Sequence, residues 1–282
     1  MDMQSGPMNI AQALVAARAL GLDRLDAQLL LLHALGRPAG DRAWLVAHDT
    51  DALPETARTS FLALSQRRTA GEPLAYITGS KEFFGLDLQI DARVLVPRPD
   101  TETLVEWGLE CMSGLRGAAA LDLGTGSGAI ALALKASRPD ATVSAVDASA
   151  EALQVAGANA GRLALSIRFL QGSWFGPVRG QFDLIVSNPP YIAAGDPHLP
   201  ALAHEPLQAL ASGPDGLDDI RVLAAQAPVH LFAGGWLLLE HGYDQAPAVR
   251  ALLVQNGFLQ VQSRVDLAGI ERCSGGQRPA LG

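Results

Sequence analysis

The sequence changes its hydrophobic periodicity near residue 117, and this change constrains the fold more than any other feature. Beyond that point, short apolar runs alternate with segments of helical periodicity. The runs cover residues 119–123, 141–146, 167–170, 182–186 and 236–239. Short apolar strands separated by helices are typical of a parallel sheet with helices on both faces. We therefore predict an α/β fold built on a doubly wound, mostly parallel sheet.

The first part of the chain has a different pattern. Residues 1–74 show helical periodicity and no strand pattern. Asn9 is a suitable N-cap for a helix that ends near Gly21, and a second helix is expected over 25–35. Pro54 suits the first turn of a further helix. We predict a small all-α domain over residues 1–74.

Residues 75–96 form a third kind of segment. Leu86, Leu88 and Ile90 alternate with polar residues, which indicates a β-hairpin. Pro97 and Pro99 then interrupt the chain, and Asp100 or Thr101 can cap the helix that follows. We expect a hairpin connection over 75–96 and a second domain over 97–282.

Composition narrows the class of protein. The chain has 282 residues and a net charge of −8, which gives no overall attraction to phosphate backbones and weakens nucleic-acid readings. The N-terminus lacks a secretory pattern, no apolar run is long enough to span a bilayer, and the two cysteines suggest free thiols in a reducing compartment. The six histidines show no metal-ligand spacing. We predict a soluble cytoplasmic protein with no metal site.

A glycine-rich loop follows the first of the apolar runs. Gly124, Thr125, Gly126, Ser127 and Gly128 stand where the predicted strand meets a helix. Glycines at this junction let the backbone turn sharply and approach a ligand closely. The loop also satisfies the dinucleotide pattern G-x-G-x-x-G/A, so a dehydrogenase has to be considered.

Two carboxyl groups bear on the choice of cofactor. Asp147 ends the second strand and suits the ribose hydroxyls of either NAD or S-adenosylmethionine. Asp122, expected at the mouth of the loop, would repel a pyrophosphate but attract the methionine ammonium of S-adenosylmethionine. An adenosyl-bearing cofactor is therefore predicted, with the methyl donor favoured over NAD.

The tetrapeptide Asn188-Pro189-Pro190-Tyr191 follows the strand at 182–186. In a doubly wound sheet it faces the cofactor, because ligands gather at the carboxyl ends of the strands. The Asn188 side-chain oxygen and the Pro189 carbonyl can accept the two hydrogens of a planar amide or amino nitrogen, which aims its lone pair at a methyl group. The prolines fix the backbone, and Tyr191 can stack on a flat substrate. Asn188, Pro189 and Tyr191 are the candidate catalytic residues, and all four are candidate substrate-binding residues.

The sequence resembles the HemK/PrmC family of protein-glutamine methyltransferases. The resemblance covers nearly the whole chain from about Tyr76 and, more loosely, the helical N-terminal part. The matching stretches are 76–79, 82–85, 96–102, 121–131, 186–192, 205–207, 209–210, 215–217 and 237–242. Asn-Pro-Pro-Tyr alone is shared with amino-methyltransferases of adenine and cytosine in DNA and RNA. The Pro-Arg-Pro-Asp-Thr-Glu run at 97–102 is the stretch that separates the glutamine enzymes from them.

The resemblance implies a class I, Rossmann-like methyltransferase that modifies the glutamine of the Gly-Gly-Gln motif in class I peptide chain release factors. It implies that S-adenosylmethionine is bound by residues 124–128, Asp147, Trp174 and Asn188, with Trp174 beside the adenine. The N-terminal helical domain would dock the release factor. Arg98 and Glu102 would either shape the far wall of the site or form internal ion pairs.

Two alternatives to this reading stay open from the residues. The tetrapeptide also fits an amino-methyltransferase acting on adenine or cytosine in RNA or DNA, although no basic tract supports one. A cofactor-binding module without turnover is a further alternative. The chain also carries its own Gly275-Gly276-Gln277, which we interpret as a chance match rather than a site of self-methylation.

Overall fold

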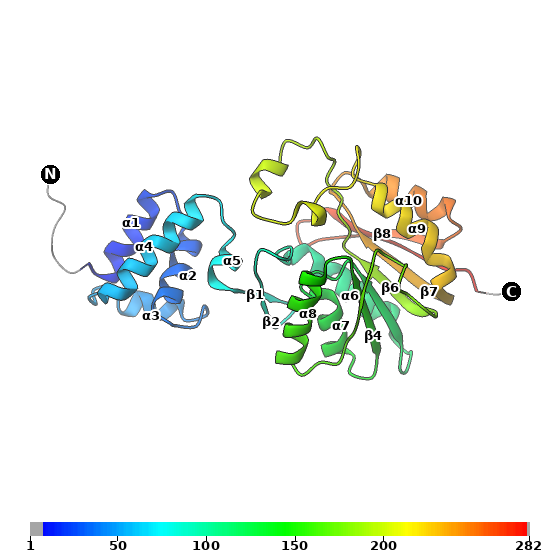
Figure 1. The fold of residues 1–282 in the computed structure, drawn as a ribbon, viewed down its shortest axis with the longest axis horizontal. Coiled ribbons are helices and arrows are strands. Elements are labelled where there is room, and N and C mark those ends of the chain that lie inside the picture. The colour runs from blue at the N-terminus through cyan, green and yellow to red at the C-terminus, as the bar shows by residue number, and fades with distance from the viewer. Residues whose placement is uncertain (1–7, 281–282) are drawn as a thin grey trace. The chain divides into compact units, whose positions relative to one another are not determined.

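The protein is described by a computed structural model that covers residues 8–280. The chain divides into two compact units, residues 1–79 and 80–282 (Figure 1). Each unit has a hydrophobic core of its own. In the described residues no helix combines the length and the apolar character needed to cross a membrane.

The first unit consists of helices, as its periodicity predicts. Its elements are α1 (Ile10–Ala19), α2 (Arg24–Ala34), α3 (Arg42–Ala47), α4 (Glu55–Thr69) and α5 (Leu74–Thr78). Asn9 caps α1 as expected, and with Gln12 it forms a reciprocal capping box. Pro54 precedes α4 as its N-cap rather than lying in its first turn. Phe61 and residues Leu30, Leu31 and Leu32 of α2 are fully buried, so packing of apolar faces holds these short helices together.

A two-stranded antiparallel hairpin opens the second unit. β1 (Ser80–Phe83) pairs with β2 (Leu86–Gln89), which confirms the predicted hairpin over a shorter range. Asn159 fastens it to the rest of the unit, because its side chain accepts from the Gln89 N–H at 2.7 Å and donates to the Gln89 carbonyl at 3.0 Å. The same side chain donates to the carbonyl of Ser127 at 3.0 Å, so one buried amide holds both the hairpin and the glycine loop.

A seven-stranded sheet forms the centre of this unit. Its strands are β3 (Ala119–Leu123), β4 (Thr142–Asp147), β5 (Arg168–Gln171), β6 (Phe182–Ser187), β7 (Leu231–Glu240), β8 (Leu259–Val265) and β9 (Glu271–Gln277). The strand order is β5-β4-β3-β6-β7-β9-β8. Strand β9 runs in the opposite direction to the other six strands, which are parallel to one another. The predicted doubly wound, mostly parallel sheet is confirmed.

Helices cover both faces of the sheet (Figure 1). They are α6 (Glu102–Cys111), α7 (Ala129–Ser137), α8 (Ala150–Arg162), α9 (Asp218–His230) and α10 (Ala246–Gln255). Leu121, Ile185 and Leu237 point to the face that α9 and α10 bury. On the other face the α carbon of Gly108 in α6 comes so close to the sheet that an added Cβ would lie 3.0 Å from Leu184. The expected side-chain cap at the start of α6 is absent, because Thr101 makes no capping bond there and a short 3-10 turn, η1 (Pro99–Thr101), leads into the helix instead.

The carboxyl ends of the parallel strands define where a ligand can bind. The chain leaves β3 in one direction across the sheet and later returns to add β6 on the other side of β3. This reversal leaves a crevice at the carboxyl ends of the two strands, where ligands bind in open α/β sheets. The glycine loop follows β3 and the tetrapeptide follows β6, so the topology brings the two predicted motifs to the same edge.

The Gly-Gly-Gln near the C-terminus belongs to the sheet. Gly275 and Gly276 lie in β9 between β7 and β8, where an added Cβ would collide with Leu238 and would lie 2.7 Å from Phe258. The Gln277 side chain donates to the carbonyl of Gly234 at 2.8 Å. It lies opposite Trp236, at the end of the sheet remote from the tetrapeptide. The glycines are needed for packing, which agrees with reading this tripeptide as a chance match.

Candidate active site

A pocket opens at the carboxyl edge of the sheet, between the glycine loop and the tetrapeptide. Of the residues predicted to form the site, six line it: Gly124, Gly126, Asp147, Trp174, Asn188 and Pro190. Thr125, Ser127, Gly128, Pro189 and Tyr191 lie outside this lining. Thr125 and Ser127 are buried residues of the glycine loop. The sequence did not predict the contributions of Arg93, Val94, Leu95, Pro206, Gln208, Ala209 and Asp219 to the pocket wall.

Backbone hydrogen bonds and the absence of side chains set the shape of the glycine loop. The N–H groups of Gly124 and Thr125 both donate to the carbonyl of Val146, at 2.9 and 3.0 Å, which ties the loop to the end of β4. Gly124 has φ +74°, and a Cβ there would lie 3.3 Å from the ring of Trp174. Because a side chain would fill this space, only glycine leaves room for a ligand between the loop and the tryptophan ring.

Asp147 is fixed at the end of β4 and lines the pocket. One carboxyl oxygen accepts from the N–H of Gly126 at 2.8 Å, and the other accepts from the N–H of Ser149 at 2.9 Å. Each oxygen keeps lone-pair capacity beyond these bonds. The carboxyl group is therefore oriented in advance for a pair of ligand hydroxyl groups.

Asp122 lies beneath the loop rather than at its mouth. Its side chain is fully buried and does not line the pocket. One oxygen accepts from the Thr125 hydroxyl at 2.6 Å and from the N–H of Ala131 at 3.3 Å, while Oδ1 has no partner within residues 8–280. Burial raises the pKa of Asp122 to about 7. Because Asp122 is inaccessible from the pocket, the predicted position at the loop mouth is wrong, and its charge can act on a bound ligand only through the loop.

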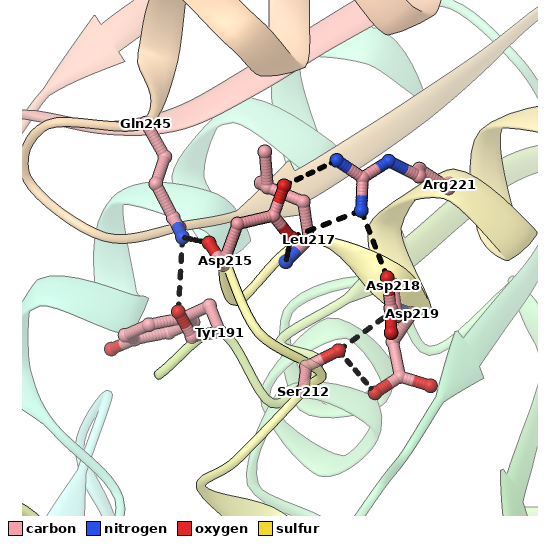
Figure 2. A network of polar contacts seen from close by, with 8 residues as sticks. All are labelled: Tyr191, Ser212, Asp215, Leu217, Asp218, Asp219, Arg221 and Gln245. Carbon is pink, nitrogen blue, oxygen red and sulfur yellow. Dashed lines mark hydrogen bonds and ion pairs between the residues drawn. The ribbon is translucent and has the colours of Figure 1, made fainter. Parts of the chain in front are cut away.

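Trp174 adopts a conformation that is rare for its residue type. Its φ is +45°, in the left-handed region that bulky side chains avoid. The indole N–H donates to Asp219 at 3.1 Å, and Asp219 also accepts from the Ser212 hydroxyl at 2.7 Å (Figure 2). Strain of this kind persists only when surrounding contacts hold it, and it concentrates at ligand sites.

Asn188 is anchored from both sides. The preceding Ser187 donates its hydroxyl to the carbonyl of Leu123 at 2.6 Å, which joins the ends of β6 and β3. The Asn188 side-chain N–H₂ donates to the hydroxyl of Thr101 at 3.3 Å. Because Asn188 lines the pocket, this bond leaves its side-chain oxygen free to accept a hydrogen from a ligand.

Tyr191 is held at both its ring and its backbone. Its hydroxyl donates to the buried carboxyl group of Glu240 at 3.4 Å, and burial together with Glu240 raises the pKa of Tyr191 well above its usual value. Its carbonyl accepts from Gln245 at 3.0 Å, and Gln245 also donates to the carbonyl of Asp215 (Figure 2). These contacts fix the exit of the tetrapeptide loop.

The Pro-Arg-Pro-Asp-Thr-Glu run connects several segments around the tetrapeptide. Its polar side chains each contact a different segment of the chain. Arg98 pairs with the buried Glu205 at 2.5 Å, and Asp100 pairs with Arg272 of β9 at 3.3 Å. Glu102 accepts from the N–H of Phe84 at 3.0 Å in the hairpin turn. Neither Arg98 nor Glu102 lines the pocket, so internal contacts account for both.

The fold and the site define a class of protein. The family model described as "Methyltransferase small domain" matches residues 104–211. A crystal structure titled as a methyltransferase from Pyrococcus furiosus superposes with a TM-score of 0.54 at 22% identity, over 70% of this chain and 90% of that one. With the sheet order, the glycine loop and Asp147 in the positions described, the chain has the fold of a class I S-adenosylmethionine-dependent methyltransferase.

Comparison over the whole chain identifies the family. The model described as "PrmC N-terminal domain" matches residues 8–79. A release factor glutamine methyltransferase of Burkholderia pseudomallei is 48% identical over 95% of this chain and 97% of its own length. One from Bordetella pertussis is 50% identical over 91% of this chain and 95% of its own length. The chain belongs to the family of release factor glutamine methyltransferases.

Proposed function

We propose that the protein transfers the methyl group of S-adenosylmethionine to the side-chain amide nitrogen of the glutamine in the Gly-Gly-Gln motif of class I peptide chain release factors. The observation that carries the chemistry is the orientation of Asn188. Its N–H₂ is bound to Thr101, so its oxygen is left for the acceptor nitrogen. The naming of relatives at 46–50% identity supports the glutamine and the release factor as substrate.

The pocket has the groups that a methionine-linked adenosine requires. The cofactor supplies a methyl group on a positively charged sulfur, which is reactive enough to need no metal. We assign Asp147 to the ribose hydroxyls and Trp174 to the flat face of the adenine. The buried Asp122 beneath the loop would favour the positive end of the methionine through its charge alone. Gly124 and Gly126 leave room for the chain between them.

The tetrapeptide activates the acceptor. An amide nitrogen is a poor nucleophile because its lone pair is delocalised into the carbonyl group. The Asn188 oxygen and the Pro189 carbonyl would accept its two hydrogens, which places electron density on the nitrogen and directs it to the methyl carbon. Pro190 lines the pocket, and the hydrogen bond of Tyr191 to Glu240 fixes the end of the tetrapeptide behind it.

The helical residues 1–74 are assigned as the part that docks the release factor, residues 75–96 as the hairpin connection, and residues 97–282 as the catalytic domain. The match of the "PrmC N-terminal domain" to residues 8–79 supports a family-specific role for the helical part. Because release factors act on ribosomes, the reaction is assigned to the cytoplasm.

Labelled methyl transfer tests the proposed function. The protein is incubated with labelled S-adenosylmethionine and a purified release factor, either wild type or with the glutamine of Gly-Gly-Gln replaced by alanine. We expect label on the wild-type factor alone and none on bulk RNA or DNA. Equal labelling of both factors would overturn the glutamine assignment, and labelling of nucleic acid would favour the amino-methyltransferase alternative.

A further inference from the structure

Asn188 and two buried side chains form a polar chain that leads away from the pocket. Asn188, at the pocket wall, donates to the hydroxyl of Thr101 at 3.3 Å. The Thr101 side chain also lies beside the carboxyl group of Glu240, the last residue of β7, and its interaction with that group lowers the pKa of Glu240. Thr101 is 3% exposed and Glu240 is 1% exposed, so water does not compete for these bonds. Neither residue lines the pocket.

The number of hydrogens that each group can donate determines which group donates and which accepts along this polar chain. A threonine hydroxyl has one hydrogen to donate and two lone pairs to offer. An ionised carboxyl group only accepts, so it takes the one hydrogen of Thr101. The Thr101 oxygen can then act toward Asn188 only as an acceptor, and Asn188 must present its N–H₂ group.

We propose that Thr101 and Glu240 are positioning residues that set the Asn188 amide so that its oxygen, and not its N–H₂, faces the acceptor nitrogen of the substrate. The inference rests on the proposed function, because it assigns a purpose to that orientation. In the reverse orientation two N–H donors would face the hydrogens of the acceptor amide, and nothing would draw the nitrogen lone pair toward the methyl group.

The surroundings of Glu240 make this setting sensitive to protonation. Asp100, Tyr191 and Arg272 face its carboxyl group, Cys273 pairs with it across the sheet, and its Oε2 has no partner among the described residues. Burial and the charge of Asp100 raise the pKa of Glu240 to about 7, against the contacts with Thr101, Tyr191 and Arg272. A protonated Glu240 can donate to Thr101, which releases the Thr101 hydrogen to the Asn188 oxygen and permits the reversed amide.

Substitution of Thr101 tests the inference. Thr101→Val keeps the buried shape but removes both hydrogen bonds, whereas Thr101→Ser keeps the hydroxyl. With a release factor as substrate and saturating cofactor, we expect Thr101→Val to lower kcat about 10- to 100-fold. KM for the release factor and Kd for S-adenosylmethionine should change by less than about threefold, since uniform binding is untouched. Thr101→Ser should recover most of kcat, and Thr142→Val on the exposed start of β4 serves as the matched control.

Three outcomes overturn the inference. They are a Thr101→Val variant as active as wild type, Thr101→Val and Thr101→Ser equally impaired, and a loss that falls on cofactor Kd instead of kcat. Should Thr101→Val fail to fold, Glu240→Gln provides the second measurement. Wild-type kcat should rise as the pH passes through about 7 and Glu240 loses its proton, and this rise should be absent from Glu240→Gln. Retention of the rise in Glu240→Gln contradicts the inference. Wild-type protein that labels no release factor would instead show that the proposed function is wrong.

Discussion

At the residue scale, the site uses two aspartates in contrasting surroundings. Asp147 stands at the pocket wall with both carboxyl oxygens bound by backbone N–H groups. Asp122 is buried beneath the loop, its Oδ1 has no partner among the described residues, and burial raises its pKa to about 7. We propose that the first carboxyl group binds neutral hydroxyl groups and that the charge of the second is stabilised when the cationic cofactor is bound.

Asp122→Asn should separate stability from cofactor binding. In the folded cofactor-free protein the pKa of Asp122 lies above its unfolded value, so this group stabilises the fold at low pH and the stabilisation is lost as the pH rises toward about 7. From about pH 4 to pH 7, the wild type is expected to lose roughly 2–4 kcal/mol more unfolding free energy than Asp122→Asn. S-adenosylmethionine affinity should fall in the variant. The measurements are urea unfolding across pH and calorimetric titration with cofactor, with Asp244→Asn at an exposed site as control. Equal pH dependence in both proteins would contradict the assigned pKa.

Asn188→Ala should remove turnover and spare cofactor binding. Loss of one positioned hydrogen-bonding group at a reacting centre costs about 100-fold or more in kcat. Because the adenosine contacts that we propose lie on the glycine loop, Asp147 and Trp174, Kd for S-adenosylmethionine should change little. Single-turnover kinetics measures the first quantity and calorimetry the second. Asn256→Ala, at the end of α10, is the control, and near-normal turnover in Asn188→Ala would mean that the orienting role is wrong.

At the element scale, the tetrapeptide loop is held by segments that come later in the chain. Gln245 before α10 and the turn at 215–217 before α9 close around the Tyr191 carbonyl (Figure 2). Arg221 on α9 pairs with Asp215 and Asp218, which fixes that turn. The chemistry therefore depends on a loop whose shape is set by its neighbours.

Gly216→Ala tests this dependence. Gly216 has φ +76°, and a Cβ at this position would collide with the Tyr191 carbonyl. A left-handed alanine alone costs about 1–2 kcal/mol, and the collision adds displacement of the tetrapeptide. We expect kcat to fall at least tenfold, with Tm lowered by several degrees. Gly257→Ala, with φ +80° and open space around it, carries the same backbone cost without the collision. If both variants lose kcat equally, contact with Tyr191 is not the cause.

The sequence predicted the elements whose pattern is local and missed those that depend on distant packing. Strand β3 coincides with its predicted range, because an apolar run between polar flanks indicates a buried strand by itself. Strand β9 was not predicted. Its Ser274-Gly275-Gly276 resembles a turn, yet the space that side chains would fill there is taken by Leu238 and Phe258. Nothing in the sequence around the glycines indicates that these neighbouring side chains fill the space.

At the scale of the whole molecule, the candidate site joins residues that are far apart in the sequence. The sequence predicted the positions of three features, because each lies at the carboxyl end of a recognisable strand. They are the glycine loop, Asp147 and Asn188. The contacts of Asn188 with Thr101 and of Trp174 with Asp219 span 87 and 45 residues. Such contacts depend on the order of the strands and on loop paths, which no short motif contains. For the same reason the sequence left the role of Arg98 open, because its partner Glu205 lies far along the chain.

The division into two units leads to a prediction about substrate recognition. Because residues 1–79 form a unit with its own core, removal of this unit should leave the cofactor pocket of residues 80–282 in place. We expect the shortened protein to bind S-adenosylmethionine normally but to lose at least tenfold in kcat/KM on an intact release factor. Activity on a short Gly-Gly-Gln peptide should be the same for both proteins. Unchanged kcat/KM on the intact factor would contradict a docking role for the helical unit.

The position of the transferred methyl group tests the central claim most directly. A release factor treated with the protein and S-adenosylmethionine is digested, and its Gly-Gly-Gln peptide is fragmented by tandem mass spectrometry alongside the same peptide from an Asn188→Ala reaction. We predict one added methyl group on the side-chain nitrogen of the glutamine with the wild-type protein, and none with the variant. A methyl group on another residue, or an unmodified peptide from the wild-type reaction, would contradict it.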